Sequence, residues 1–181
     1  HGGCGLVVTE MVSSDGLVRG IDRTLEYAEY TEEERPVSIQ IFGGDPEKMA
    51  AAASIVEGMG ADIVDVNMGC PVPKIAKHNA GCSLMREPEH AAEIIAAMTR
   101  AVTIPVTVKM RVGMAHIEED VERVAAVRKA IGPRVSLMCD ASRGFTADHA
   151  IRLGRRLEEF GLTWFEEPVA AHDLAGSARV A

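Results

Sequence analysis

Asn67 and Cys70 bring a carboxamide and a thiol together directly after a short apolar run over residues 61–66. An apolar run of this length, bounded by turn residues such as Gly69 and Pro71, is typical of a buried parallel strand. In barrels of alternating strands and helices, the active site lies just past the carboxyl ends of the strands. An ordinary thiol is mostly protonated at neutral pH, so Cys70 is a candidate proton donor. The alternative is a buried structural cysteine, and these residues alone leave both interpretations open.

Polar side chains also stand near the ends of the other apolar runs, which we interpret as strands. The runs cover residues 5–10, 37–42, 62–67, 106–111, 135–140 and 163–166. The candidate site residues on them are Gln40, Asn67, Lys109, Arg111, Asp140 and Glu166. Because the carboxyl ends of parallel strands meet at one edge of a sheet, we expect these side chains to gather at one site.

Helical patterns separate the runs at residues 46–59, 88–102, 118–131 and 147–160. This alternation predicts an α/β fold with parallel strands and right-handed crossovers, either a (β/α)8 barrel or an open doubly wound sheet. Polar residues at nearly every strand end favour the barrel, because an open sheet binds its ligand at one switch point. A complete barrel takes about 250 residues. We therefore predict a partial (β/α)8 TIM barrel of about six parallel strands.

Composition narrows the function classes. Hydrophobic residues make up 47% of the 181 residues, enough for a core, but no apolar run is long enough for a membrane span. Four scattered cysteines without a C-x-x-C pair argue against a zinc knuckle or a disulfide scaffold and favour a reducing, cytoplasmic setting. The net charge of −8 does not suggest a nucleic-acid binder, although basic residues follow Cys70 and could form a local patch.

The first 113 residues resemble the tRNA-dihydrouridine synthases, which are flavin enzymes on a (β/α)8 barrel. The resemblance rests on four ordered motifs, at residues 6–13, 34–43, 67–74 and 106–113. It implies reduction of uridine in tRNA, with FMN as cofactor, NADPH as reductant and Cys70 as the proton donor. It also implies that Gln40 and Lys109 contact FMN, and that Asn67 and Arg111 bind the substrate.

The last part of the chain, from about residue 109 to residue 181, resembles the mandelate-racemase-like branch of the enolase superfamily. The motifs lie at residues 117–124, 126–132, 137–141 and 164–168. The resemblance implies Mg²⁺ binding by Asp140 and Glu166, with a third carboxylate expected beyond the sequence. Lys109 and Arg111 fall at positions that supply a base in that family, but arginine does not readily deprotonate. The alternative is that the two carboxylates pair with Arg143 or Lys109.

Both resemblances meet at residues 109–113, so the chain resembles a fusion of two barrel fragments, residues 1–113 and 114–181. The leading hypothesis is an FMN-dependent oxidoreductase of the tRNA-dihydrouridine synthase type, in which fusion could have abolished activity. One alternative is a Mg²⁺-dependent dehydratase or racemase of the enolase type. Another is a catalytically silent module that self-associates through open sheet edges.

Overall fold

The computed structural model describes residues 3–113 and 116–181 of the chain. Within them, seven strands form one parallel sheet in the order β1-β3-β4-β5-β6-β7, and β2 also pairs with β3. The strands are β1 (Val7–Val8), β2 (Val12–Ser13), β3 (Val37–Phe42), β4 (Ile63–Met68), β5 (Val106–Arg111), β6 (Ser136–Asp140) and β7 (Leu162–Glu166). Five of the six predicted strands are therefore confirmed to within one residue at each end.

The first predicted strand, residues 5–10, differs: it forms the short strand β1, and a second short strand, β2, follows it. Val8 pairs with Ser38 and Val12 with Ile41, so this part of the chain has one more residue than β3 between the two pairs. The hydroxyl of Thr9 fills the gap by accepting a hydrogen bond from the backbone N–H of Gln40 at 3.2 Å. An extra residue of this kind bends a strand and interrupts its ladder.

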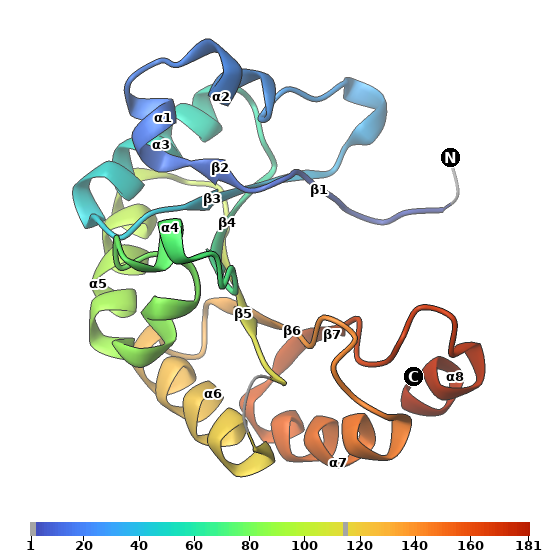
Figure 1. Ribbon diagram of the computed structural model, residues 1–181. Helices are drawn as coiled ribbons and strands as arrows, with labels where there is room; N and C mark the ends of the chain where they lie inside the picture. The colour runs from blue at the N-terminus through green and yellow to red at the C-terminus, as the bar shows by residue number, and fades with distance from the viewer. Residues whose placement is uncertain (1–2, 114–115) are drawn as a thin grey trace.

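Helices cover one face of the sheet, as Figure 1 shows for the four longest. These are α3 (Pro46–Gly58), α5 (Pro88–Ala101), α6 (Ile117–Ile131) and α7 (Ala147–Leu157), and they confirm the four predicted helices. Shorter elements that the sequence patterns did not predict are α1 (Ser14–Val18), α2 (Asp22–Glu26), η1 (Glu32–Glu34), α4 (Pro73–Ala76), η2 (Gly81–Arg86), η3 (Glu158–Phe160) and α8 (Leu174–Val180).

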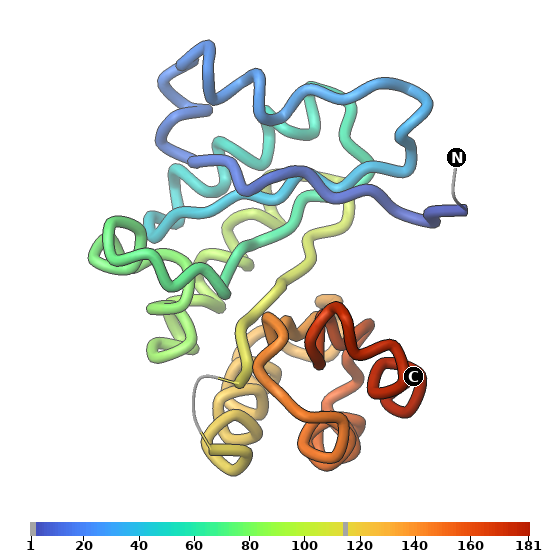
Figure 2. The backbone as a smooth tube through the Cα atoms, turned by 45° about the vertical axis from the view of Figure 1, so that its right-hand side comes forward, coloured from blue at the N-terminus to red at the C-terminus, as the bar shows by residue number. Residues whose placement is uncertain are grey.

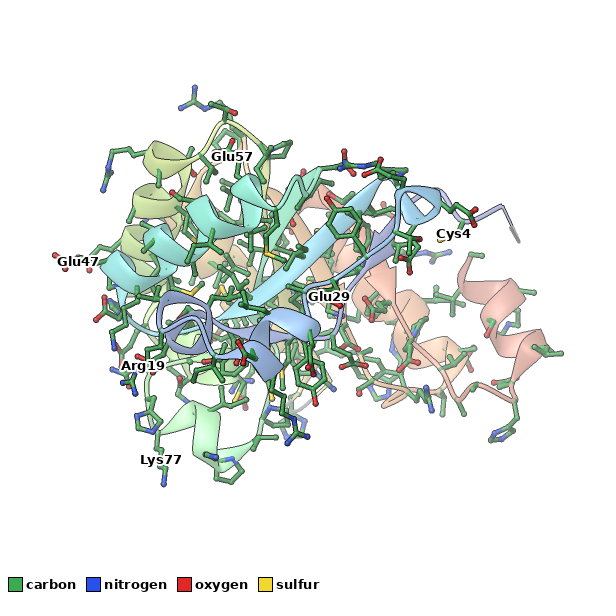
Figure 3. All side chains as sticks on the ribbon, turned by 90° about the horizontal axis from the view of Figure 1, so that it is seen from above. Cys4, Arg19, Glu29, Glu47, Glu57 and Lys77 are labelled. Atoms are coloured by element: carbon green, nitrogen blue, oxygen red, sulfur yellow. The ribbon has the colours of Figure 1, made fainter. Side chains whose placement is uncertain are left out.

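Local interactions fix where the long helices begin and how they meet the strands. Asp45 caps α3 by accepting hydrogen bonds from the N–H groups of Glu47 and Lys48, at 3.0 and 3.1 Å. Near the other end of α3, the carboxylate of Glu57 accepts from the N–H and hydroxyl groups of Thr103, at 2.7 and 2.6 Å. Figure 3 labels Glu47 and Glu57 at the two ends of this helix. These bonds tie α3 to the loop that leads into β5.

The main hydrophobic core lies between the sheet and the helices and runs through both parts of the chain. It includes Ile39, Val66 and Met110 from the strands, and it extends to Val124 on α6 and Leu153 on α7. In Figure 2 the yellow-green segment of β5 runs between the blue-green half and the orange-red half. The predicted α/β class and partial (β/α)8 barrel are therefore confirmed.

Two further predictions concern the boundary between the two parts of the chain and the open edges of the sheet. The boundary expected between residues 113 and 114 borders residues 114 and 115, which lie outside the described part of the chain. Strands β1 and β2 lie at one edge of the sheet, and β7 forms the other edge. Among the described residues, no helix is long and apolar enough to cross a membrane.

Candidate active site

A pocket of about 610 Å³ lies on the face of the sheet that the long helices leave uncovered. Along β3, β4, β5 and β6 its lining residues alternate with core residues, because successive side chains of a strand point to opposite faces. All seven residues predicted from the sequence line this pocket: Gln40, Asn67, Cys70, Lys109, Arg111, Asp140 and Glu166. The structure thus brings together side chains from five strands and one loop.

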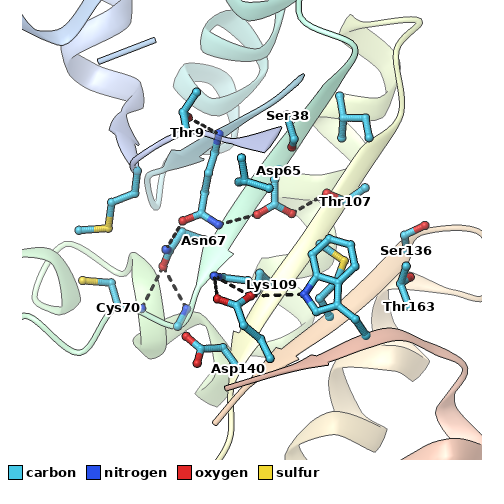
Figure 4. A pocket seen from close by; sticks show the side chains of 18 of the residues that line it. Thr9, Ser38, Asp65, Asn67, Cys70, Thr107, Lys109, Ser136, Asp140 and Thr163 are labelled. Carbon is cyan, nitrogen blue, oxygen red and sulfur yellow. Dashed lines mark hydrogen bonds and ion pairs between the residues drawn. The ribbon is translucent and has the colours of Figure 1, made fainter. Parts of the chain in front are cut away.

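A chain of hydrogen bonds runs across the pocket floor (Figure 4). Asp65 accepts from the Thr107 hydroxyl at 2.5 Å and from Gln40 Nε2 at 2.7 Å. Gln40 Oε1 in turn accepts from Asn67 Nδ2 at 2.7 Å. Asn67 Oδ1 accepts from the backbone N–H groups of Gly69 and Cys70, at 3.0 and 2.9 Å. These last two bonds fix the orientation of the Asn67 amide, and that amide fixes the orientation of Gln40.

Asp65 and Thr107 are pocket residues that our sequence reasoning missed. Asp65 is buried, and this burial raises the pKa of its carboxyl from the ordinary 3.8 to about 6, against the opposing effect of the hydrogen bonds from Thr107 and Gln40. The signal was available in the sequence. Asp65 stands two positions before Asn67 inside an apolar strand, so both side chains point to the same face of the sheet.

Cys70 is held in place from its backbone. The residue is only 7% exposed, and its carbonyl accepts a hydrogen bond from the N–H of Cys82 at 3.0 Å. Gly81, with φ of +60°, makes this close approach possible, since a Cβ there would lie 2.6 Å from the Cys70 carbonyl oxygen. The loop 70–82 therefore closes back on Cys70, while Asn67 holds its other side.

The charged residues of the pocket form two ion pairs. Lys109 Nζ lies 2.9 and 3.1 Å from the two carboxylate oxygens of Glu166. Arg111 lies 3.2 Å from Asp140 Oδ2, and its buried Nε has no hydrogen-bond partner among the described residues. The pairing expected between a carboxylate and Lys109 is therefore confirmed. The pairing expected for Arg143 is wrong, because Arg143 binds Glu167 instead.

Asp140 and Glu166 are register partners on β6 and β7, as the enolase-like motifs predict. Each is already paired with a cation from β5. Within residues 3–113 and 116–181, no group of three or more His, Cys, Asp or Glu side chains is arranged to hold a metal ion. The geometry of these two carboxylates is therefore that of partners for Lys109 and Arg111.

Comparison with known families assigns both parts of the chain. The family model for dihydrouridine synthase (Dus) matches residues 2–134, and the model for the enolase C-terminal domain-like family matches residues 89–181. The chain therefore belongs to the dihydrouridine synthase family, and its later part also belongs to the enolase C-terminal domain-like family. The two matches overlap over residues 89–134, which contain β5, α6 and all of α5 except Pro88.

Individual relatives agree with the first assignment. The chain is 41% identical over 130 residues to tRNA-dihydrouridine synthase B from Proteus vulgaris, a match that covers 72% of this chain and 40% of the relative. It is 40% identical over 143 residues to a probable tRNA-dihydrouridine synthase from Rhodobacter capsulatus, covering 78% and 44%. The chain thus spans less than half the length of these curated relatives.

Among solved structures, a racemase from Streptomyces coelicolor A3(2) with bound magnesium is 38% identical, with a TM-score of 0.47. That match covers 53% of this chain and 26% of the racemase.

Proposed function

We propose that this chain carries the active-site pocket of a tRNA-dihydrouridine synthase. Such an enzyme reduces uridine in tRNA with FMN as cofactor and NADPH as reductant. One observation carries the proposal: Cys70, Gln40 and Lys109 line one pocket, and Asn67 links the first two through hydrogen bonds. The family assignment and the relatives at about 40% identity support it.

The pocket suits the polar ring edge of a flavin in size and in the chemistry of its donors. Its volume of about 610 Å³ falls within the range of about 300–1,000 Å³ that is usual for ligand pockets. Lys109 and Arg111 contribute cations, and the buried Arg111 Nε is a donor without a partner in the described chain. When bound, reduced FMN would supply hydride to the uracil ring. Gln40, Lys109 and Arg111 would hold the cofactor and the substrate.

Cys70 would act as the general acid. Addition of hydride to one carbon of the uracil double bond leaves negative charge that a proton must neutralise, and the Sγ–H of Cys70 would supply that proton. The protein would contribute mainly by holding Cys70 in a fixed position in the pocket. Asn67 holds the backbone N–H of Cys70, and Gly81 lets the loop approach it closely. Asn67, at the end of β4, would also lie beside the substrate ring.

For the tRNA, we propose a contact at a second pocket of about 890 Å³ beside the Cys70 loop. Lys74 and His78 from that loop line it, together with Arg19 and Lys48. Figure 3 shows Arg19 and Lys77 projecting from the same side of the molecule. Asp15 already pairs with Arg19 and Lys48, so Lys74, Lys77 and His78 would be the main phosphate contacts.

The visible absorption spectrum of the purified chain tests the cofactor proposal. We expect flavin bands to remain after FMN is added and the protein is desalted. We also expect Cys70→Ala to keep these bands but to lose reduction of uridine in tRNA. Cys4→Ala is the matched control, because Cys4 is exposed and lies outside the pocket. A colourless protein would refute the cofactor assignment, and an active Cys70→Ala variant would refute the role of the thiol.

We also propose that residues 1–113 and 114–181 are fragments of different ancestry that meet just after β5 and complete one core. The overlap of the two family matches around β5 supports this division. A magnesium-dependent activity of the enolase type has less support, because both candidate metal ligands are engaged by cations.

A further inference from the structure

Glu166 and Lys109 form an ion pair across the pocket although their strands are not neighbours. Lys109 lies on β5 and Glu166 on β7, with β6 between them. The pair passes over Met138, which is the register partner of Lys109 on β6. Both carboxylate oxygens of Glu166 lie within 3.1 Å of Lys109 Nζ. The ammonium of Lys109 is therefore held toward β7, and only 19% of its side chain is exposed.

The other ion pair of the pocket is built differently. Asp140, the partner of Arg111, also accepts a hydrogen bond from the N–H of Ser142 at 2.7 Å, so its own turn holds this carboxylate in place. Among the described residues, the partners of Glu166 are side chains, namely Lys109 and the indole N–H of Trp164 at 3.3 Å. Loss of the Lys109 contact would therefore leave Glu166 with the Trp164 hydrogen bond, whereas the backbone of the turn would still hold Asp140.

We propose that Glu166 competes with the flavin for Lys109 and thereby sets the flavin affinity of this chain, an inference that rests on the function proposed above. The polar edge of the flavin ring and the carboxylate of Glu166 would both bind the ammonium group of Lys109. If the flavin binds, it must either displace Glu166 or accept a negative charge beside its own polar edge, and both lower the affinity. Glu166 comes from the part of the chain that matches the enolase-like family alone. The competition would then be a property of the joined chain.

Glu166→Gln tests this competition, because glutamine keeps the size of the side chain and removes its charge. The dissociation constants of FMN and of riboflavin are measured by quenching of flavin fluorescence. We expect both ligands to bind the variant about tenfold more tightly, which corresponds to about 1.4 kcal/mol. Riboflavin reports on the ring without the phosphate. Glu167→Gln is the matched control, because Glu167 pairs mainly with Arg143 and does not line the pocket, so we expect a much smaller change than in Glu166→Gln.

A second measurement follows Lys109 without any flavin. The rate at which acetic anhydride acetylates Lys109 is read by peptide mass spectrometry, and we expect it to rise in Glu166→Gln. Lys48, which pairs with Asp15, serves as the internal reference within the same sample. An unchanged rate at Lys109 would overturn the inference.

The flavin titration separates the two proposals. Equal flavin affinity in the original chain and in Glu166→Gln would overturn the competition and leave the flavin site standing. Absence of flavin binding in the original chain would refute the proposed function, and the inference would fall with it.

Discussion

Replacing Asp65 by asparagine tests whether one buried carboxyl group makes the stability of this chain depend on pH. Asp65 accepts two hydrogen bonds in the pocket floor, from Thr107 and from Gln40. Asparagine can keep both neighbours: its oxygen can accept from Gln40, and its amide can donate to the Thr107 hydroxyl. The Asn67 amide then keeps its orientation, so the substitution removes charge from the floor with little change in its geometry.

The size of the effect follows from the pKa of Asp65. Burial raises that pKa from 3.8 to about 6 in the folded chain. At about 1.4 kcal/mol for each pH unit, this gap corresponds to about 3 kcal/mol. The folded chain binds the proton more tightly than the unfolded chain does. The charged carboxylate therefore destabilises the fold above pH 6, and the destabilisation disappears as the pH falls from 6 to 3.8.

The assay is urea unfolding of the original chain and of Asp65→Asn between pH 4 and pH 7.5. We expect the difference in free energy of unfolding to grow by about 2 kcal/mol from pH 4 to pH 7.5, in favour of the variant, because part of the roughly 3 kcal/mol is already present at pH 4. Other carboxyl groups titrate in both proteins and cancel in the difference. Asp22→Asn, an exposed site on α2, is the control that should show no such growth. A difference that stays constant with pH would refute the reasoning.

Three further predictions concern the loop, the carboxylates and the sheet edges. Gly81→Ala should destabilise the fold by at least about 1–3 kcal/mol, because a Cβ would meet the Cys70 carbonyl oxygen at a φ of +60°. Gly58→Ala, in open space on α3, should instead stabilise the fold by about 0.5–1 kcal/mol, and thermal melts compare the two variants. Millimolar Mg²⁺ should leave the melting temperature unchanged, because Lys109 and Arg111 already pair with Glu166 and Asp140; a rise that Asp140→Ala abolishes would contradict this. Size-exclusion chromatography should show self-association through the two sheet edges, and a clean monomer would count against it.

Much of the fold was predictable because the strands are short apolar runs that carry a polar residue at or near the carboxyl end. The runs that became β3, β4 and β5 have this form, and their ends were placed to within one residue. The extra residue near Thr9 was not predictable, because it depends on a hydroxyl that replaces a backbone partner across the sheet. Short helices such as α4 and α8 lack the length over which a helical pattern can be recognised.

The candidate site was predictable in membership but not in its internal contacts. All seven expected residues line the pocket, since polar residues at the ends of parallel strands converge there. Which donor meets which acceptor depends on spatial register, and the sequence does not contain that directly. The position of Asp65 on the pocket face could be inferred from the strand, but its partners could not, because Gln40 and Thr107 lie 25 and 42 residues away along the chain.

A single irregularity between β6 and β7 decides the charge balance of the pocket. Leu137 pairs with Leu162 and Cys139 pairs with Phe165, so β7 has one residue more than β6 between these pairs. In an unbroken ladder, Asp140 would pair with Phe165, and the aromatic ring would point into the pocket. The irregularity instead makes Glu166 the partner of Asp140. The carboxylate thus reaches Lys109, while Phe165 packs against the core beneath α7. One inserted residue therefore gives Lys109 a carboxylate partner, while the pair of Arg111 and Asp140 on β5 and β6 does not depend on it.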